Sequence, residues 1–254
     1  TTMRQSIRLI LCLLIAPLLT GGCAILEEKD ETANWTAEQF VAVGQTELAA
    51  GDWPAAIATY QKMQGRFPYG RNAEQAQLDI AYAHFKNNES ALAVVTANRF
   101  IQMHPTHPNV DYAYYLKGLA LFEPPDSLLD DITGKSPANH DIRPVREAFV
   151  AYRELVSRFP DSRYASDARK RLVYIINVLA MHDVDIARYY YSLGADVAAV
   201  NRARSVLETY QNSTAVEHAL AVMVKAYKRM GLTELHDDTT RVLQLNYPKS
   251  KYLN

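Results

Sequence analysis

The sequence has few cysteines, no surplus of either charge and, after its first twenty residues, no long hydrophobic run. Cys12 and Cys23 are the only cysteines among 254 residues, so the body of the chain has no disulfide and must rest on core packing. The 27 Lys and Arg residues are balanced by 28 Asp and Glu residues, which excludes the basic surface that nucleic-acid binding requires. No later segment approaches the about 20 apolar residues that a transmembrane helix needs.

The common catalytic motifs are also missing: there is no H-E-x-x-H, no G-x-S-x-G and no glycine-rich phosphate loop. His104 and His107, with Asp111, have the spacing of a candidate metal site. Pro105 and Pro108, however, place both histidines in a turn that ends a helix, where capping or surface roles fit better. We therefore expect a protein that is not an enzyme and that has no cofactor and no metal ion.

Residues 1–22 have the pattern of a secretory signal peptide. Arg4 and Arg8 flank the start of an apolar run that extends over residues 7–19, and two small residues follow it. The unbroken apolar part is about half the length of a transmembrane helix, so a removable signal is favoured over a membrane-spanning anchor. The chain is therefore predicted to be exported.

The sequence LLTGGC at residues 18–23 resembles a bacterial lipobox, although Thr20 stands where the usual motif has leucine. The resemblance implies cleavage before Cys23, which would then carry the acyl chains, and two or more chains give stable anchoring. Because Ala24 and not aspartate follows, the likeness to enteric lipoproteins implies the periplasmic face of the outer membrane of a Gram-negative bacterium. Ordinary cleavage near Gly22, which would leave Cys23 free, is the alternative.

The rest of the chain divides into a tether and a folded body. Residues 23–35 are polar, acidic and without a helical period, which predicts a flexible tether after the lipidated cysteine. Residues 36–254 have apolar side chains at spacings of three and four, few glycines and no alternating, strand-like runs. This pattern predicts an all-α body.

An internal repeat runs through this body. Pro68 and Pro105 are 37 residues apart, as are Gln211 and Pro248. A residue that tolerates positive φ stands 17 residues before each of these helix ends, which marks the turn of a helical hairpin: Gly51, Asn88, Gly194 and Gly231. The tetratricopeptide pattern of bulky, small, turn, small, aromatic and proline positions fits Phe40, Gly44, Gly51, Ala56, Tyr60 and Pro68.

We therefore predict an all-α, tetratricopeptide-like, right-handed superhelix of five hairpins, at about 36–70, 72–107, 109–160, 161–211 and 213–248. The third hairpin has an insertion at 123–143 whose prolines and polar residues are typical of a long surface loop. Residues 161–193 contain no Gly or Pro and are predicted to form one long helix in the fourth hairpin. A helical bundle without a repeat is the alternative.

Four segments resemble the BamD family of outer-membrane lipoproteins more closely than a generic repeat does. They are HPTHPNVDYAYYLKGLA at 104–120, RFPYG at 66–70, KRLVYI at 170–175 and GADVAAVNRA at 194–203. The resemblance covers the body and implies a scaffold that binds a BamA-like insertase, contacts accessory lipoproteins and receives unfolded outer-membrane proteins. Family members often have Arg before the glycine of the fourth hairpin, whereas this chain has Leu193. A secretin-escorting pilotin and an adaptor that regulates a cell-wall enzyme are the alternatives.

The repeat register predicts a groove for client peptides in the second and third hairpins. In tetratricopeptide repeats, positions 2, 5, 9 and 12 of the first helix line the concave face. Here these positions carry mainly aromatic and aliphatic side chains, for which burial in the core is the alternative. Beside Gln75, the predicted groove residues are Leu78, Tyr82, Phe85, Tyr112, Tyr115, Leu119 and Phe122.

The fourth and fifth hairpins carry basic residues at the corresponding positions, and the resemblance implies that the insertase binds there. If Ala199, Ala203 and Val206 form the packed stripe of their helix, Arg202 should point outward beside Asn201. A solvated helix face is the alternative for the lysines. The predicted partner interface is Arg188, Asn201, Arg202, Lys225 and Lys228.

Overall fold

The computed structural model describes residues 30–122 and 141–253 and divides the chain into two units, Thr1–Thr36 and Ala37–Asn254. In the described part of the first unit, the Thr32 hydroxyl donates a 2.6 Å hydrogen bond to Asp30 in a turn. The predicted signal peptide, Cys23 and residues 123–140 of the insertion lie outside the described residues. None of the helices within the described ranges is long and apolar enough to span a membrane.

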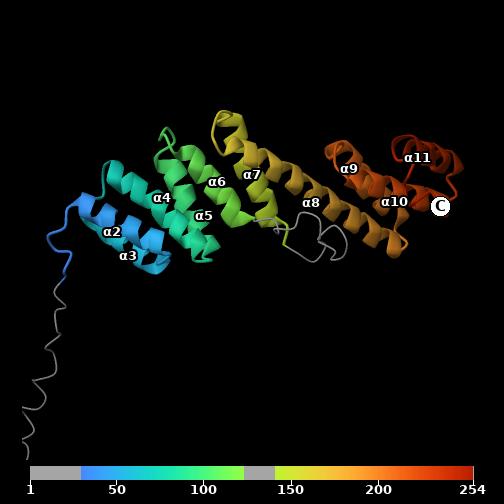
Figure 1. Cartoon of the computed structure of the whole chain (residues 1–254). Helices are drawn as coiled ribbons and strands as arrows, with labels where there is room; N and C mark the ends of the chain where they lie inside the picture. The colour runs from blue at the N-terminus through green and yellow to red at the C-terminus, as the bar shows by residue number, and fades with distance from the viewer. Residues whose placement is uncertain (1–29, 123–140, 254) are drawn as a thin grey trace, which may run out of the picture. The chain divides into compact units, whose positions relative to one another are not determined.

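The second unit is built from helices, and its described residues contain no strand. Each helix packs against the next along the chain, so the helices form successive hairpins, as Figure 1 shows. The first helices of neighbouring hairpins also touch, α2 with α4, α4 with α6 and α8 with α10. The helices are α2 (Ala37–Ala50), α3 (Trp53–Arg66), α4 (Arg71–Lys86), α5 (Ser90–Met103), α6 (Val110–Leu121), α7 (Arg143–Arg158), α8 (Ala165–Ser192), α9 (Asp196–Thr209), α10 (Ala215–Arg229) and α11 (Thr233–Asn246).

The four predicted turn residues all adopt positive φ, between 61° and 77°. In each turn, the residue after the turn position donates its N–H to the carbonyl five residues earlier in the preceding helix. The first of these bonds runs from Asp52 N to Glu47 O at 2.9 Å, and the last from Leu232 N to Tyr227 O at 3.0 Å. This pattern satisfies carbonyls that the helix end would otherwise leave without partners. The five predicted hairpins are confirmed, with turns at Gly51, Asn88, Gly194 and Gly231 and the long connection between α6 and α7.

The long helix is also confirmed, because α8 has 28 residues and at 1.5 Å per residue is about 42 Å long. It begins at Ala165, four residues later than the sequence pattern predicts. The preceding residues form a turn instead, in which Ala165 N donates to Ser162 O at 2.9 Å. The Ser162 hydroxyl donates a 2.6 Å hydrogen bond to Asp111, which fixes this turn against the start of α6.

Small residues let the two helices of a hairpin approach closely. A Cβ placed on Gly44 would lie 2.5 Å from the Tyr60 ring, and one on Gly118 would lie 2.5 Å from the Tyr152 ring. Both tyrosine rings are fully buried. Glycine at these positions therefore makes room for an aromatic side chain of the partner helix, which is the packing that the repeat pattern predicts.

The Gly118→Ala variant should be less stable than the unaltered protein. Alanine favours a helix over glycine by about 1 kcal/mol, but overpacking a filled core typically costs about 1–3 kcal/mol. Gly65 is the matched control, because it lies in α3 and a Cβ there meets nothing within 4 Å. Thermal unfolding followed by circular dichroism should show a lower Tm for Gly118→Ala and an equal or higher Tm for Gly65→Ala. Equal shifts in the two variants would contradict the close approach.

Candidate functional site

Aromatic rings from four elements lie next to one another along the first three hairpins and the start of α8. The Trp53 and Tyr82 rings meet edge to face with centroids 5.8 Å apart. The Tyr164 ring lies 5.3 Å from that of Tyr112 and stacks on that of Tyr115 at 4.8 Å. We call these five residues the aromatic wall. Aromatic pairs in such arrangements contribute about 0.5–1.5 kcal/mol beyond the area they bury.

Six of the seven predicted groove residues keep part of their surface exposed: Tyr82, Phe85, Tyr112, Tyr115, Leu119 and Phe122. Leu78 is the exception, because it is fully buried in a core cluster with Phe100 and Val110. The prediction was wrong for Leu78, since a fully buried side chain has no surface to offer to a peptide. The stripe that remains accessible on α4 is Gln75, Asp79 and Tyr82, at spacings of four and three residues.

Asp79 is the charged member of this stripe, and its carboxylate accepts a 2.8 Å hydrogen bond from the Gln75 amide. Burial raises the pKa of Asp79, while the hydrogen bond from Gln75 opposes that rise. Burial also raises the pKa of Tyr112, with further contributions from the negative charges of nearby groups that include Asp79. The wall is therefore a partly exposed surface in which the Tyr112 phenol remains protonated.

Tyr115 is held in place by a polar network as well as by its stacking. Its hydroxyl donates a 2.8 Å hydrogen bond to Asp167, whose carboxylate also accepts from Arg171 Nε at 2.5 Å. Burial acts to raise the pKa of Asp167, but the hydrogen bonds from Arg171 and Tyr115 outweigh burial and lower it. Tyr115 thus links α6 to the first turn of α8, so this ring contributes to the fold and also presents a surface.

The two histidines of the candidate metal site instead flank one carboxylate. His104 Nδ1 lies 3.8 Å from Glu74 and His107 Nε2 lies 3.5 Å from it. Both imidazole rings pack on the Phe100 ring, with centroids 5.1 Å away. They join α4, α5 and the start of α6. No group of three or more His, Cys, Asp or Glu side chains in residues 30–122 and 141–253 is arranged to hold a metal ion.

In the second predicted site, Asn201, Lys225 and Lys228 are exposed. Arg188 is also exposed, but it donates hydrogen bonds to Asp185 at 3.0 Å and to the Tyr252 hydroxyl at 3.3 Å. The Lys225 ammonium lies 5.8 Å from the centroid of the same Tyr252 ring. Arg188 and Lys225 therefore meet around Tyr252 on one face of α8 and α10. Asn201 lies on α9, outside this set of contacts.

Arg202 lies outside the packed stripe of Ala199, Ala203 and Val206, and its side chain is 40% exposed, but it is also tied to a neighbouring helix. Its Nη1 donates a 3.3 Å hydrogen bond to Asp183 of α8, a carboxylate whose side chain is only 7% exposed. Arg202 lies on the flank of α9, between the buried stripe and the outer face, and a long arginine side chain on a flank can reach back to the neighbouring helix. Its main contact is therefore within the chain.

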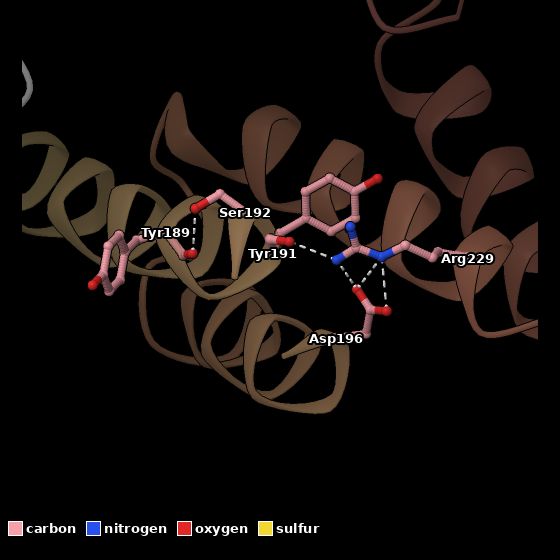
Figure 2. Close-up of polar contacts among 5 residues, drawn as sticks. All are labelled: Tyr189, Tyr191, Ser192, Asp196 and Arg229. Atoms are coloured by element: carbon pink, nitrogen blue, oxygen red, sulfur yellow. Dashed lines mark hydrogen bonds and ion pairs between the residues drawn. The ribbon is translucent and has the colours of Figure 1, made fainter. Parts of the chain in front are cut away.

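A clamp that sequence reasoning missed joins three helices near the turn of the fourth hairpin (Figure 2). Arg229 of α10 donates from Nε to both carboxylate oxygens of Asp196 at 2.9 and 2.8 Å, and from Nη2 to the Tyr191 carbonyl at 2.5 Å. Its guanidinium carbon lies 3.8 Å from the centroid of the Tyr191 ring. Hydrogen bonds from Arg229 lower the pKa of Asp196. Because 33 residues separate Asp196 from Arg229, no local sequence signal links them.

The sequence also did not predict Trp53 and Tyr164 as members of the wall, or Asp79 as the charged residue on the accessible stripe of α4 beside it. Trp53 starts α3 and Tyr164 precedes α8, so neither occupies a first-helix groove position in the repeat register. The sequence signal for Trp53 and Tyr164 is weaker than the repeat register: each is an aromatic residue directly beside a hairpin turn or a helix start.

The Arg202→Glu variant should lower the Tm, because it removes the hydrogen bond to buried Asp183 and places two carboxylates together. A hydrogen bond to a charged group contributes about 1.5–3 kcal/mol, and leaving a buried charge without its partner adds to the loss. Asn201→Glu is the matched control, since it adds a carboxylate to the same helix at an exposed position. Adding Asp183→Asn to Arg202→Glu should recover part of the loss. Equal melting temperatures for the two single variants would contradict the pairing.

Comparison with known proteins gives a consistent result. Residues 33–252 match the family model YfiO, described as an outer membrane lipoprotein. The outer membrane protein assembly factor BamD of Neisseria meningitidis serogroup A is 40% identical over 240 residues, which cover 93% of this chain and 90% of the relative. BamD of Vibrio cholerae is 33% identical over 92% of this chain and 96% of its own length.

Among solved structures, a thermophilic TPR protein of Thermus thermophilus aligns with 86% of this chain and 95% of its own, at 14% identity and a TM-score of 0.30. The family match and the BamD relatives favour the assembly function over the two alternatives, a secretin-escorting pilotin and an adaptor of a cell-wall enzyme. The chain belongs to the BamD family of outer membrane protein assembly factors.

Proposed function

We propose that this protein is a lipid-anchored, periplasmic scaffold of the β-barrel assembly machine and has no catalytic step of its own. Its first three hairpins receive segments of unfolded outer-membrane proteins. Its last two hairpins bind a BamA-like insertase and contact accessory lipoproteins. The main support for the proposal is the aromatic wall, because it offers partly exposed rings on successive hairpins of a family that assembles outer-membrane proteins.

The spacing of the wall suits an extended client segment. Packed helices lie about 8–10 Å apart, so a strand that rises about 3.3 Å per residue would meet a new ring at every third residue or so. Strands of outer-membrane barrels alternate apolar and polar side chains and carry aromatic residues near both membrane interfaces. Each ring contact contributes only about 0.5–1.5 kcal/mol beyond buried area, which keeps release of the client easy.

The last two hairpins offer a different surface, which supports their proposed role as the partner interface. Lys225, Lys228 and Asn201 are exposed, and Leu193 and Val197 beside the α8–α9 turn are 62% and 65% exposed. Large exposed apolar side chains next to charged ones are typical of protein interfaces. With Leu193 at the position where relatives often have arginine, a contact there would be apolar in this chain.

The aromatic wall can be tested with the Tyr82→Ala variant. A labelled peptide with the sequence of the last strand of an outer-membrane barrel should bind about 2- to 10-fold more weakly, as expected for loss of one aromatic contact. Tyr69, which is 90% exposed and outside the wall, supplies the control variant Tyr69→Ala. Fluorescence anisotropy measures the affinity, and circular dichroism checks that helicity is kept. Equal affinity of the two variants would show that the wall does not receive the client.

Lipid anchoring can be tested with the Cys23→Ala variant, which should appear in the soluble fraction after cell lysis. The body should remain folded, because Ala37–Asn254 forms a unit of its own. Cys12→Ala is the control, since Cys12 lies within the predicted signal peptide and its loss should leave the protein in the membrane fraction. If Cys23→Ala stays with membranes in cells that lack the insertase, the protein is held there by something other than lipid on Cys23.

A further inference from the structure

Tyr252, which follows the last helix, lies on the face formed by α8 and α10. Its hydroxyl is 2.7 Å from His218 Nδ1 and 3.3 Å from Arg188 Nη2, and its ring meets the His218 ring edge to face at 5.5 Å. The ammonium groups of Lys225 and Lys251 lie 5.8 and 5.4 Å from the centre of the Tyr252 ring. One phenol side chain therefore contacts four basic residues.

The hydrogen-bond roles at this phenol follow from its neighbours. Arg188 can only donate, so the phenol oxygen accepts from it and has its own hydrogen available for His218. Burial lowers the pKa of His218, and the positive charges of Arg188 and Lys251 lower it further, against the effect of Glu217 and Asp185. A neutral imidazole can accept the phenol hydrogen at Nδ1.

The charges around Tyr252 favour an anion. Arg188 is the nearest cation to the phenol oxygen and shares its charge with Asp185 at 3.0 Å, while Lys225 and Lys251 face the ring. A neutral phenol gives a donor such as Arg188 a weaker hydrogen bond than a carboxylate does, because charge-assisted hydrogen bonds are roughly twice as strong. Tyr252 therefore fills this face with the aromatic half of a ligand, and its neutral ring offers no carboxylate to Lys225 or Lys251.

The segment that carries Tyr252 is short and follows the last helix, with Ser250 buried within it. After α11, Ser250 N donates to Tyr247 O at 2.9 Å, and Tyr252 N donates to the Ser250 hydroxyl at 3.3 Å. These bonds lie within the segment, whereas its described polar contacts to α8 and α10 pass through the Tyr252 hydroxyl. Release of Tyr252 would thus expose the face without breaking a helix.

We propose that Tyr252 is an internal ligand that closes a cationic binding face of α8 and α10, and that this face takes a partner's peptide segment in which an aromatic residue adjoins carboxylates. The inference rests on the proposed role of the last two hairpins as the partner surface, and it names the chemistry of what they bind. Occupation by Tyr252 lowers the apparent affinity for the partner in proportion to the fraction of molecules in which the face is closed.

The test uses the full-length protein in detergent micelles and a fluorescein-labelled pentapeptide with one tyrosine between two glutamates. In anisotropy titrations at low salt, Tyr252→Ala should bind this peptide about tenfold more tightly than the unaltered protein, as for a face that is open about a tenth of the time. Arg188→Gln added to Tyr252→Ala should abolish the gain. Raising the salt concentration should weaken binding, because exposed charges are screened.

Two controls make the result specific. A matched peptide with both glutamates replaced by glutamine should gain little from Tyr252→Ala, and Tyr69→Ala should leave the affinity for the acidic peptide unchanged. Equal affinity of Tyr252→Ala and the unaltered protein, or an equal gain for the glutamine peptide, overturns the proposal. If Tyr252→Ala loses helicity, Tyr252→Phe replaces it, because it removes only the hydroxyl and should give a smaller gain of the same sign.

The readout also separates this inference from the proposed function. Co-purification with the insertase is measured independently on the same variants. If the acidic peptide binds as expected but the insertase never co-purifies, the cationic face stands and its assignment to the insertase fails. If the insertase co-purifies while the peptide shows no gain with Tyr252→Ala, the internal ligand is refuted and the scaffold role stands.

Discussion

The close approach of the two helices within a hairpin is the constraint on which the described fold depends. Gly44 and Gly118 leave the space that the buried rings of Tyr60 and Tyr152 fill, so a methyl group at either glycine would collide with the facing ring. In the first hairpin, Gly51 at positive φ lets the chain reverse directly into this contact. Each hairpin packs on the next. A wider spacing between the two helices of one hairpin would therefore change the surfaces of the neighbouring hairpins.

In the aromatic wall, a packing surface and the proposed client surface share the same residues. Tyr115 stacks on Tyr164 and donates to Asp167, and these contacts fix α6 to the start of α8. Such rings are ordered before any peptide arrives, so binding to them costs little side-chain entropy. The same contacts mean that removing Tyr115 would disturb the fold, whereas Tyr82, at the other end of the wall, has one described aromatic partner, Trp53.

The charges of the last two hairpins are mostly satisfied within the chain. Arg202 pairs with Asp183, Arg229 with Asp196, and Arg188 with Asp185 and Tyr252. Bidentate or multiple contacts restrain the guanidinium groups and leave the lysines as the freer cations of this surface. A partner that binds there must therefore complement a preformed arrangement, and at Tyr252 it must also displace a side chain.

The sequence by itself determined the helical class, the five hairpins and their turns, because these depend on local properties: helical periodicity, small residues at fixed spacing and residues that tolerate positive φ. It also placed Tyr82, Tyr112 and Tyr115 on a partly accessible face. Only the tertiary structure decided that Asp79 and not Leu78 lies on that face. It also decided which carboxylates pair with Arg202 and Arg229. Periodicity gives the direction of a side chain about its own helix, whereas its partner depends on how helices distant in sequence pack together.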